Sequence, residues 1–156
     1  MTDRPPVGVV RWLLRAPIPL YRAGWGRLFG YRLVYLAHRG RVSGLRREVV
    51  VEVVRHRVEV PEIVVVAAWG GKPQWYRNLR VAAPIEVRCG RYRWNRPERR
   101  FLSTAELDEV LRGYRAQHPR AWARLGPRLG FPAEPSDPRW ADAVGRVHGV
   151  AFSPAR

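Results

Sequence analysis

The spacing of apolar residues changes several times in the first half of the chain. Over residues 9–29 it is helix-like but broken by prolines and glycines, which indicates a short helix, a bend and a second amphipathic piece. From residue 31 the pattern becomes rich in β-formers, and residues 31–38 and 47–56 are typical of two strands of a hairpin. Residues 63–70 form the most apolar predicted strand, which ends at a pair of glycines.

The second half begins with residues 72–84, which predict one or two helical turns stopped before a proline. Residues 85–102 then indicate a second hairpin with a glycine at its turn. Ser103 and Glu106 form a capping box that predicts the start of a helix running to His118. Two shorter helices and a closing strand are predicted at residues 119–131, 139–146 and 147–154.

Successive hairpins imply antiparallel pairing, and a closed or nearly closed sheet would leave few edges exposed for such apolar strands. The pattern therefore predicts a small antiparallel β-barrel with helices against it. We expect a single domain over residues 1–156, divided into an N-terminal helical segment (1–30), the main barrel strands (31–102), helices (103–145) and a closing strand (146–152).

Composition supports a folded protein with a substantial core. The 156 residues suit one domain, 46% of them are hydrophobic, and seven are tryptophan. Cys89 is the single cysteine, so no intrachain disulfide is possible. Prolines and arginines interrupt the first 26 residues, which does not match a signal peptide. We predict a cytoplasmic location and leave peripheral contact with the inner membrane surface open.

The formal charge is +16, and Lys72 is the only lysine. A basic surface attracts polyanions, whether nucleic acid, anionic lipid or a multiply charged cofactor. The net charge therefore indicates an anionic partner but does not distinguish among these three classes.

No reaction centre is evident among the side chains. The four histidines, His38, His56, His118 and His148, have no metal-ligand spacing, so no metal site is predicted. A nucleophile elbow is absent, and carboxylates are scarce. If the protein is an enzyme, a bound cofactor is the consistent source of its chemistry.

The first candidate binding segment is the turn "GRVSGLRR", residues 40–47. Its glycines allow backbone amides to face a ligand, its serine adds a hydroxyl and its arginines add charge, which suits phosphate or carboxylate. The alternative is a solvated turn whose arginines are simply kept out of the core.

The second candidate is "AAWGGKPQWYRNL", residues 67–79, in which the most apolar strand runs into two glycines and two aromatic residues. Flat rings beside exposed backbone amides suit a planar, hydrogen-bonding ring system. The alternative is a strand-end turn with an aromatic plug that closes the barrel.

These motifs, in this order and with matching strands between them, resemble the deazaflavin-dependent nitroreductase family, split-barrel oxidoreductases that use coenzyme F-420. The resemblance covers roughly residues 31–106. It implies an α+β fold, a small antiparallel split β-barrel of about six strands with an N-terminal helix and C-terminal helices packed outside. It also implies hydride transfer from the reduced deazaflavin to an electron-poor small molecule such as a quinone, nitroaromatic or enone.

The resemblance assigns roles to individual residues. The cofactor's phosphate and oligoglutamate tail would bind Arg41, Ser43, Gly44 and Arg47. The ring would lie against Ala67, Ala68, Trp69 and Gly70, with Trp75 and Asn78 supporting the tail side. The implied partners are this anionic cofactor and a small apolar acceptor, for which the N-terminal aromatic segment would supply Tyr21, Trp25 and Tyr31.

The chain departs from the family pattern at Val42, Val50, Ala68 and Trp69. A split barrel that binds FMN or haem therefore stays open as an alternative. An alternative of another class is a basic nucleic-acid-binding module, in which Tyr92 and Trp94 lie between arginines. The oligomeric state is left open.

Overall fold

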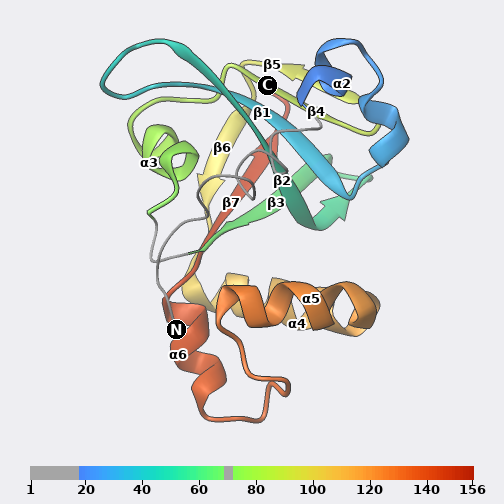
Figure 1. Ribbon diagram of the computed structural model, residues 1–156, viewed down its shortest axis with the longest axis vertical. Helices are drawn as coiled ribbons and strands as arrows, with labels where there is room; N and C mark the ends of the chain where they lie inside the picture. The colour runs from blue at the N-terminus through green and yellow to red at the C-terminus, as the bar shows by residue number, and fades with distance from the viewer. Residues whose placement is uncertain (1–17, 69–71) are drawn as a thin grey trace.

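The computed structural model describes residues 18–68 and 72–156, which form a curled antiparallel sheet with helices on its outer faces (Figure 1). The predictions for residues 9–17, Trp69 and Gly70 lie outside the described residues. The strands are β1 Leu33–Arg39, β2 Arg46–Arg57, β3 Glu62–Ala67, β4 Glu86–Cys89, β5 Tyr92–Asn95, β6 Glu98–Phe101 and β7 His148–Ser153. The helices are α2 Ile18–Arg22, η1 Gly26–Phe29, α3 Gln74–Val81, α4 Thr104–Gln117, α5 Pro119–Leu129 and α6 Arg139–Gly145.

The sheet has the strand order β5-β4-β1-β2-β3-β7-β6, and every described pairing is antiparallel. Strand β2 belongs to both halves and is irregular between Val53 and Arg55, and such irregularities bend a strand. Residues of both halves share one interior cluster, among them Leu36 of β1, Val65 of β3 and Phe152 of β7. The sheet therefore curls around a single core.

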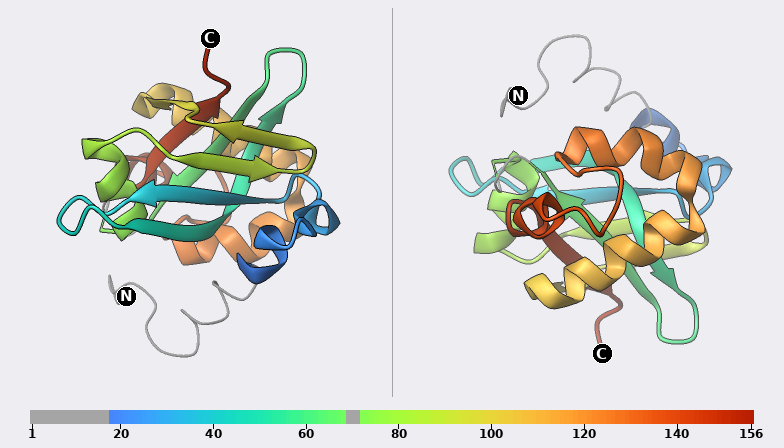
Figure 2. Two further views of the ribbon diagram at one scale, coloured as in Figure 1. Left: turned by 90° about the horizontal axis from the view of Figure 1, so that it is seen from above. Right: turned by 90° about the horizontal axis from the view of Figure 1, so that it is seen from below.

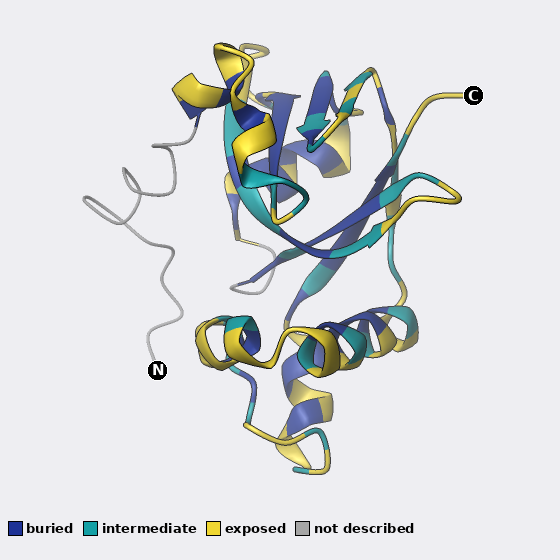
Figure 3. Ribbon diagram, turned by 90° about the vertical axis from the view of Figure 1, so that its right-hand side faces the viewer, coloured by how far each residue is buried: buried dark blue, intermediate teal, exposed yellow. Residues whose placement is uncertain are grey.

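Helices cover the outer faces of the sheet. Helices α4, α5 and α6 pack on the half that contains β3 and β7, and a second apolar cluster fills this interface (Figures 1 and 2). On the other half, Ile18 and Tyr21 of α2 pack against Tyr35 and Val50. Figure 3 shows buried residues along the strands and on the helix faces turned toward them, with exposed residues mainly in loops and on outer surfaces.

Local sequence signals account for two boundaries. The side chain of Ser103 accepts a hydrogen bond from the Glu106 backbone N–H at 3.2 Å, which confirms the predicted N-cap of α4. The predicted turn at Gly90 joins β4 to β5, and its φ of +54° is one that glycine adopts readily. A Cβ at Gly90 would also lie 2.3 Å from the Tyr31 ring, so a larger residue would displace that ring.

Residues 85–102, predicted as one hairpin, contain three strands instead of two. Arg96 has a φ of +50°, and Pro97 cannot donate a backbone hydrogen bond, so the extended run is interrupted there. As a result β5 and β6 occupy the two opposite edges of the sheet. The sheet thus has seven strands rather than about six, and the predicted α+β split-barrel class is confirmed.

Two further features bear on function. Among the described helices, none has the length and apolar character needed to cross a bilayer. In residues 18–68 and 72–156, no three His, Cys, Asp or Glu side chains come together where they could hold a metal ion.

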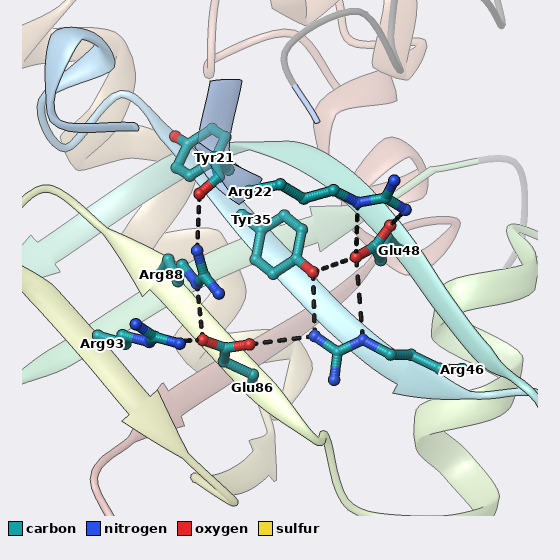
Figure 4. Close-up of polar contacts among 8 residues, drawn as sticks. All are labelled: Tyr21, Arg22, Tyr35, Arg46, Glu48, Glu86, Arg88 and Arg93. Atoms are coloured by element: carbon teal, nitrogen blue, oxygen red, sulfur yellow. Dashed lines mark hydrogen bonds and ion pairs between the residues drawn. The ribbon is translucent and has the colours of Figure 1, made fainter. Parts of the chain in front are cut away.

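A cluster of charges surrounds Glu86 on the outer face of the β4–β1–β2 half (Figure 4). Glu86 is 6% exposed, and its carboxylate accepts hydrogen bonds from Arg46, Arg88 and Arg93 at 3.0, 2.6 and 2.9 Å. Burial by itself raises the pKa of Glu86, but the three guanidiniums outweigh it and hold this pKa at about 2. Arg46 also donates to the Tyr35 hydroxyl, so the cluster ties β2 to β4 across β1.

The shared interior gives a first prediction. Leu36 is fully buried there, so Leu36→Ala should lower the free energy of unfolding by about 3 kcal/mol, measured by urea denaturation. The matched control is Leu28→Ala, at a side chain that is 73% exposed, and it should change stability by less than about 0.5 kcal/mol. Equal losses in the two variants would contradict the assignment of Leu36 to the packed core.

The Glu86 cluster gives a second prediction. Because the pKa of Glu86 lies below its unfolded value of 4.5, its contribution is complete above pH 4.5 and is lost as the pH falls toward 2. Glu86→Gln should therefore remove roughly 2 kcal/mol at pH 7 and flatten the loss of stability between pH 5 and 2. Urea denaturation at several pH values tests this, with the exposed Glu59→Gln as control. A variant as pH-dependent as the wild type would contradict it.

Candidate functional site

The loop between β1 and β2 lies against helix α3, which brings together two of the motifs singled out in the sequence (Figure 1). The backbone N–H of Arg41 donates to Asn78 Oδ1 at 3.1 Å, and its guanidinium donates to the same oxygen at 2.9 Å. The Arg41 guanidinium also donates to Gln74 Oε1 at 2.8 Å. The position of the loop is thus set by the polar face of α3.

The orientation of the Asn78 amide follows from these bonds. Since its oxygen accepts from Arg41, its nitrogen is the atom that faces His38 Nδ1 at 3.1 Å. His38 must then accept at Nδ1 and carry its proton on Nε2. Burial, assisted by the positive charge of Arg47, lowers the pKa of His38 to about 4, so the ring is neutral near pH 7.

A small cradle lies over Gly40 in the same loop. A Cβ built on Gly40 would lie 2.6 Å from Ser43 Oγ and 3.8 Å from Arg47 Nε, so these two side chains converge above the glycine. The N–H groups of Gly40 and Gly44 donate within the loop, whereas those of Val42 and Ser43 donate to no residue in the described part of the chain. A hydroxyl and a guanidinium therefore converge beside Gly40, and the same exposed loop carries two backbone donors without a described acceptor.

The loop arginines differ in what they bind. Arg39 donates to the Gly44 carbonyl at 3.0 Å, Arg41 is held by α3, and Arg46 is paired with Glu86. Arg47 forms no ion pair with a described residue. Arg47 is therefore the loop arginine whose charge is most available to a ligand.

The segment predicted to hold the ring is partly described. Ala67 and Ala68 are buried at the end of β3, and Trp69 and Gly70 lie outside the described residues. Trp75 is part of the interior cluster and meets Tyr76 edge-on. Its indole packs in the core of the barrel, next to the helix face that binds the loop.

The three predicted acceptor-side residues occupy separate places. Tyr21 is buried between Phe29 and Tyr35, and its hydroxyl donates to the Leu33 carbonyl at 3.0 Å. Trp25 is 61% exposed. Tyr31 stacks on His56, with ring centroids 4.0 Å apart. The described contacts do not join these three side chains into one pocket.

His38 and Gln74 were missed as site residues. A signal for His38 was present, because the alternation that buries Val34 and Leu36 puts His38 on the same inward face. A polar side chain on that face needs a buried partner. Gln74 is exposed and gave no comparable signal, since only the packing of α3 beside the loop brings it to Arg41.

No protein-family model matches the chain, and no curated protein matches it. Solved structures share its fold. One, described as a domain-swapped dimer, has a TM-score of 0.53 and 15% identity and is matched over 94% of this chain and all of its own. An F420-H2 dependent reductase (FDR-A) has a TM-score of 0.50 and 17% identity over 78% of this chain and 94% of its own. A protein of unknown function from Agrobacterium tumefaciens has the same score and identity over 97% of this chain and 60% of its own.

The bonding around Asn78 gives a third prediction. Asn78→Asp keeps the oxygen that accepts from Arg41 but puts a carboxylate beside His38, which favours the protonated ring. The pKa of His38 should rise from about 4 by at least about one unit, measured by NMR titration of the imidazole. Gln74→Glu makes the same chemical change on the exposed side of Arg41 and should leave this pKa nearly unchanged. An unshifted His38 in Asn78→Asp would show that the two side chains are not in contact.

Proposed function

We propose that this protein is a split-barrel oxidoreductase that binds coenzyme F-420 and passes a hydride from its reduced form to an electron-poor small molecule. The observation that carries the proposal is the convergence of Ser43 and Arg47 over Gly40, in a loop where the N–H groups of Val42 and Ser43 donate to no described residue. The fold shared with an F420-H2 dependent reductase supports the same reading.

The residues of the loop fit the anionic part of such a cofactor. Phosphate and carboxylate oxygens accept charge-assisted hydrogen bonds from guanidinium groups, each contributing about 1.5–3 kcal/mol. Arg47 would supply these bonds, with the Ser43 hydroxyl and the loop N–H groups around it. Arg41 would act mainly by holding the loop on α3, because its guanidinium already has two acceptors.

Helix α3 supports the same assignment. Its first turn lies beside the loop through Gln74, and its N-cap, Pro73, provides no side-chain acceptor for the helix N–H groups. The first N–H groups of a helix and the positive end of its dipole both favour a nearby anion.

When bound, the reduced deazaflavin supplies the hydride, so no side-chain base is required of this chain. The protein's part is to fix the tail at the loop, orient the ring at the end of β3 and limit water there. Ala67 and Ala68 are small, which leaves room for a flat ring against the backbone. Quinones, nitroaromatics and enones are suitable acceptors because each accepts a hydride at an electron-poor atom.

The proposal predicts that Arg47→Ala weakens F-420 binding by about tenfold or more, because it removes a charge-assisted contact. Fluorescence titration of the purified protein with F-420 measures this. The control is Arg57→Ala, at an exposed arginine on the opposite end of β2, which should change the affinity less than twofold. Unchanged affinity in Arg47→Ala would place the tail elsewhere.

A parallel titration with FMN and haem separates the cofactors. We expect F-420 to bind most tightly, and mixing the reduced complex with a soluble quinone should then oxidise the cofactor. Tight binding of FMN or haem without binding of F-420 would overturn the cofactor assignment. Binding of F-420 with no oxidation by quinone, nitroaromatic or enone would overturn the reductase assignment.

A further inference from the structure

A hollow lies between β2 and the junction of α4 and α5, away from the loop between β1 and β2. Figure 1 shows where these elements lie. The volume of the hollow is about 740 Å³, within the range of small-molecule sites. Its lining includes His56 near the end of β2, whereas Arg47 is near the start. The two residues are nine positions apart along β2, a separation of up to about 30 Å, so this hollow is distinct from the site assigned to the cofactor tail.

The wall of this hollow includes a stacked aromatic pair. The rings of Tyr31 and His56 are stacked at 4.0 Å with an interplanar angle of 8°, and both line the hollow. His56 Nε2 lies 3.3 Å from the Tyr92 hydroxyl, which fixes the imidazole in this plane. Such a rigid pair suits stacking with a planar ring.

The side chains that line the hollow carry more positive than negative charge. Arg55 is neutralised, because it pairs with Glu62 at 2.9 Å and lies 3.7 Å from Glu106. Arg32 and Arg120 also line the hollow, and neither forms an ion pair with a residue in the described ranges.

Glu52 is the one carboxylate among the lining residues. It accepts a hydrogen bond from the Tyr114 hydroxyl at 2.8 Å, so part of its accepting capacity is already used. Burial and this bond raise the pKa of Tyr114, while the positive charge of Arg32 acts in the opposite direction. Arg32 therefore faces this end of the hollow.

We infer that the hollow between β2 and the α4–α5 junction binds a planar aromatic anion, with its ring against Tyr31 and His56 and its charged group between Arg32 and Arg120. This site is separate from the proposed F-420 site, and either can exist without the other. The aromatic pair selects the ring, and two guanidiniums that have no ion-pair partner among the described residues select the negative group.

The test uses 2-naphthoate as probe and 2-naphthamide as its uncharged analogue, with affinities measured by calorimetry. The protein should bind the carboxylate about tenfold more tightly than the amide. Arg32→Gln and Arg120→Gln should each reduce this preference severalfold. Arg124→Gln is the control, because Arg124 is exposed on α5 with Arg120 but does not line the hollow. This variant should keep the full preference for the carboxylate.

Amide NMR locates the bound probe without relying on the variants. Shifts should appear at residues 52–56 and 117–121 rather than at the loop 40–45, and Arg47→Ala should leave the naphthoate affinity unchanged. Equal affinity for the two probes, full affinity in both arginine variants, or shifts confined to the loop would each overturn the inference.

Discussion

Seven strands turn one face toward a single apolar interior, so a polar side chain on that face must find its hydrogen-bond partners inside the protein. His38 is such a side chain, because it follows Val34 and Leu36 on the inward face of β1. Its partner is the side-chain nitrogen of Asn78 in α3. The oxygen of the same amide accepts a hydrogen bond from Arg41 in the loop after β1. The requirement to satisfy one buried imidazole therefore couples the barrel, the helix and the candidate site.

Successive side chains of a strand point to opposite faces of the sheet, and this decides which arginines near the loop find partners within the protein. Arg46 and Arg47 are consecutive in β2, so their side chains leave the strand on opposite sides. Arg46 reaches the outer face, where Glu86 and Tyr35 bind it. Arg47 reaches the side of Gly40 and Ser43 and keeps its charge available. In a chain with a net charge of +16, the informative distinction is between arginines with a protein partner and those without one.

Much of the fold could be predicted from local patterns, because hairpin turns, strand alternation and the α4 cap are encoded by neighbouring residues. The division of residues 85–102 was missed, since whether an extended run stays in one strand or crosses to another edge depends on the pairing of the whole sheet. In the site, the glycine and arginine turn was predicted as an anion-binding segment. The family resemblance placed Asn78 on the tail side of the pocket, but its contact with the loop came only from the structure, and the burial of Trp75 in the core depends on where α3 lies.

By itself, the sequence determined the order and type of most of the elements, the loop that carries exposed donors and the excess of positive charge, because each of these depends on residues close together in the chain or on composition. Tertiary structure decided which of those donors and charges remain free. Arg46 and Glu86 are forty residues apart, as are His38 and Asn78, and Arg41 and Asn78 are separated by 37. Strand curling and helix packing bring such groups within hydrogen-bond distance, so pairing over these separations follows from the curled sheet and not from any local pattern.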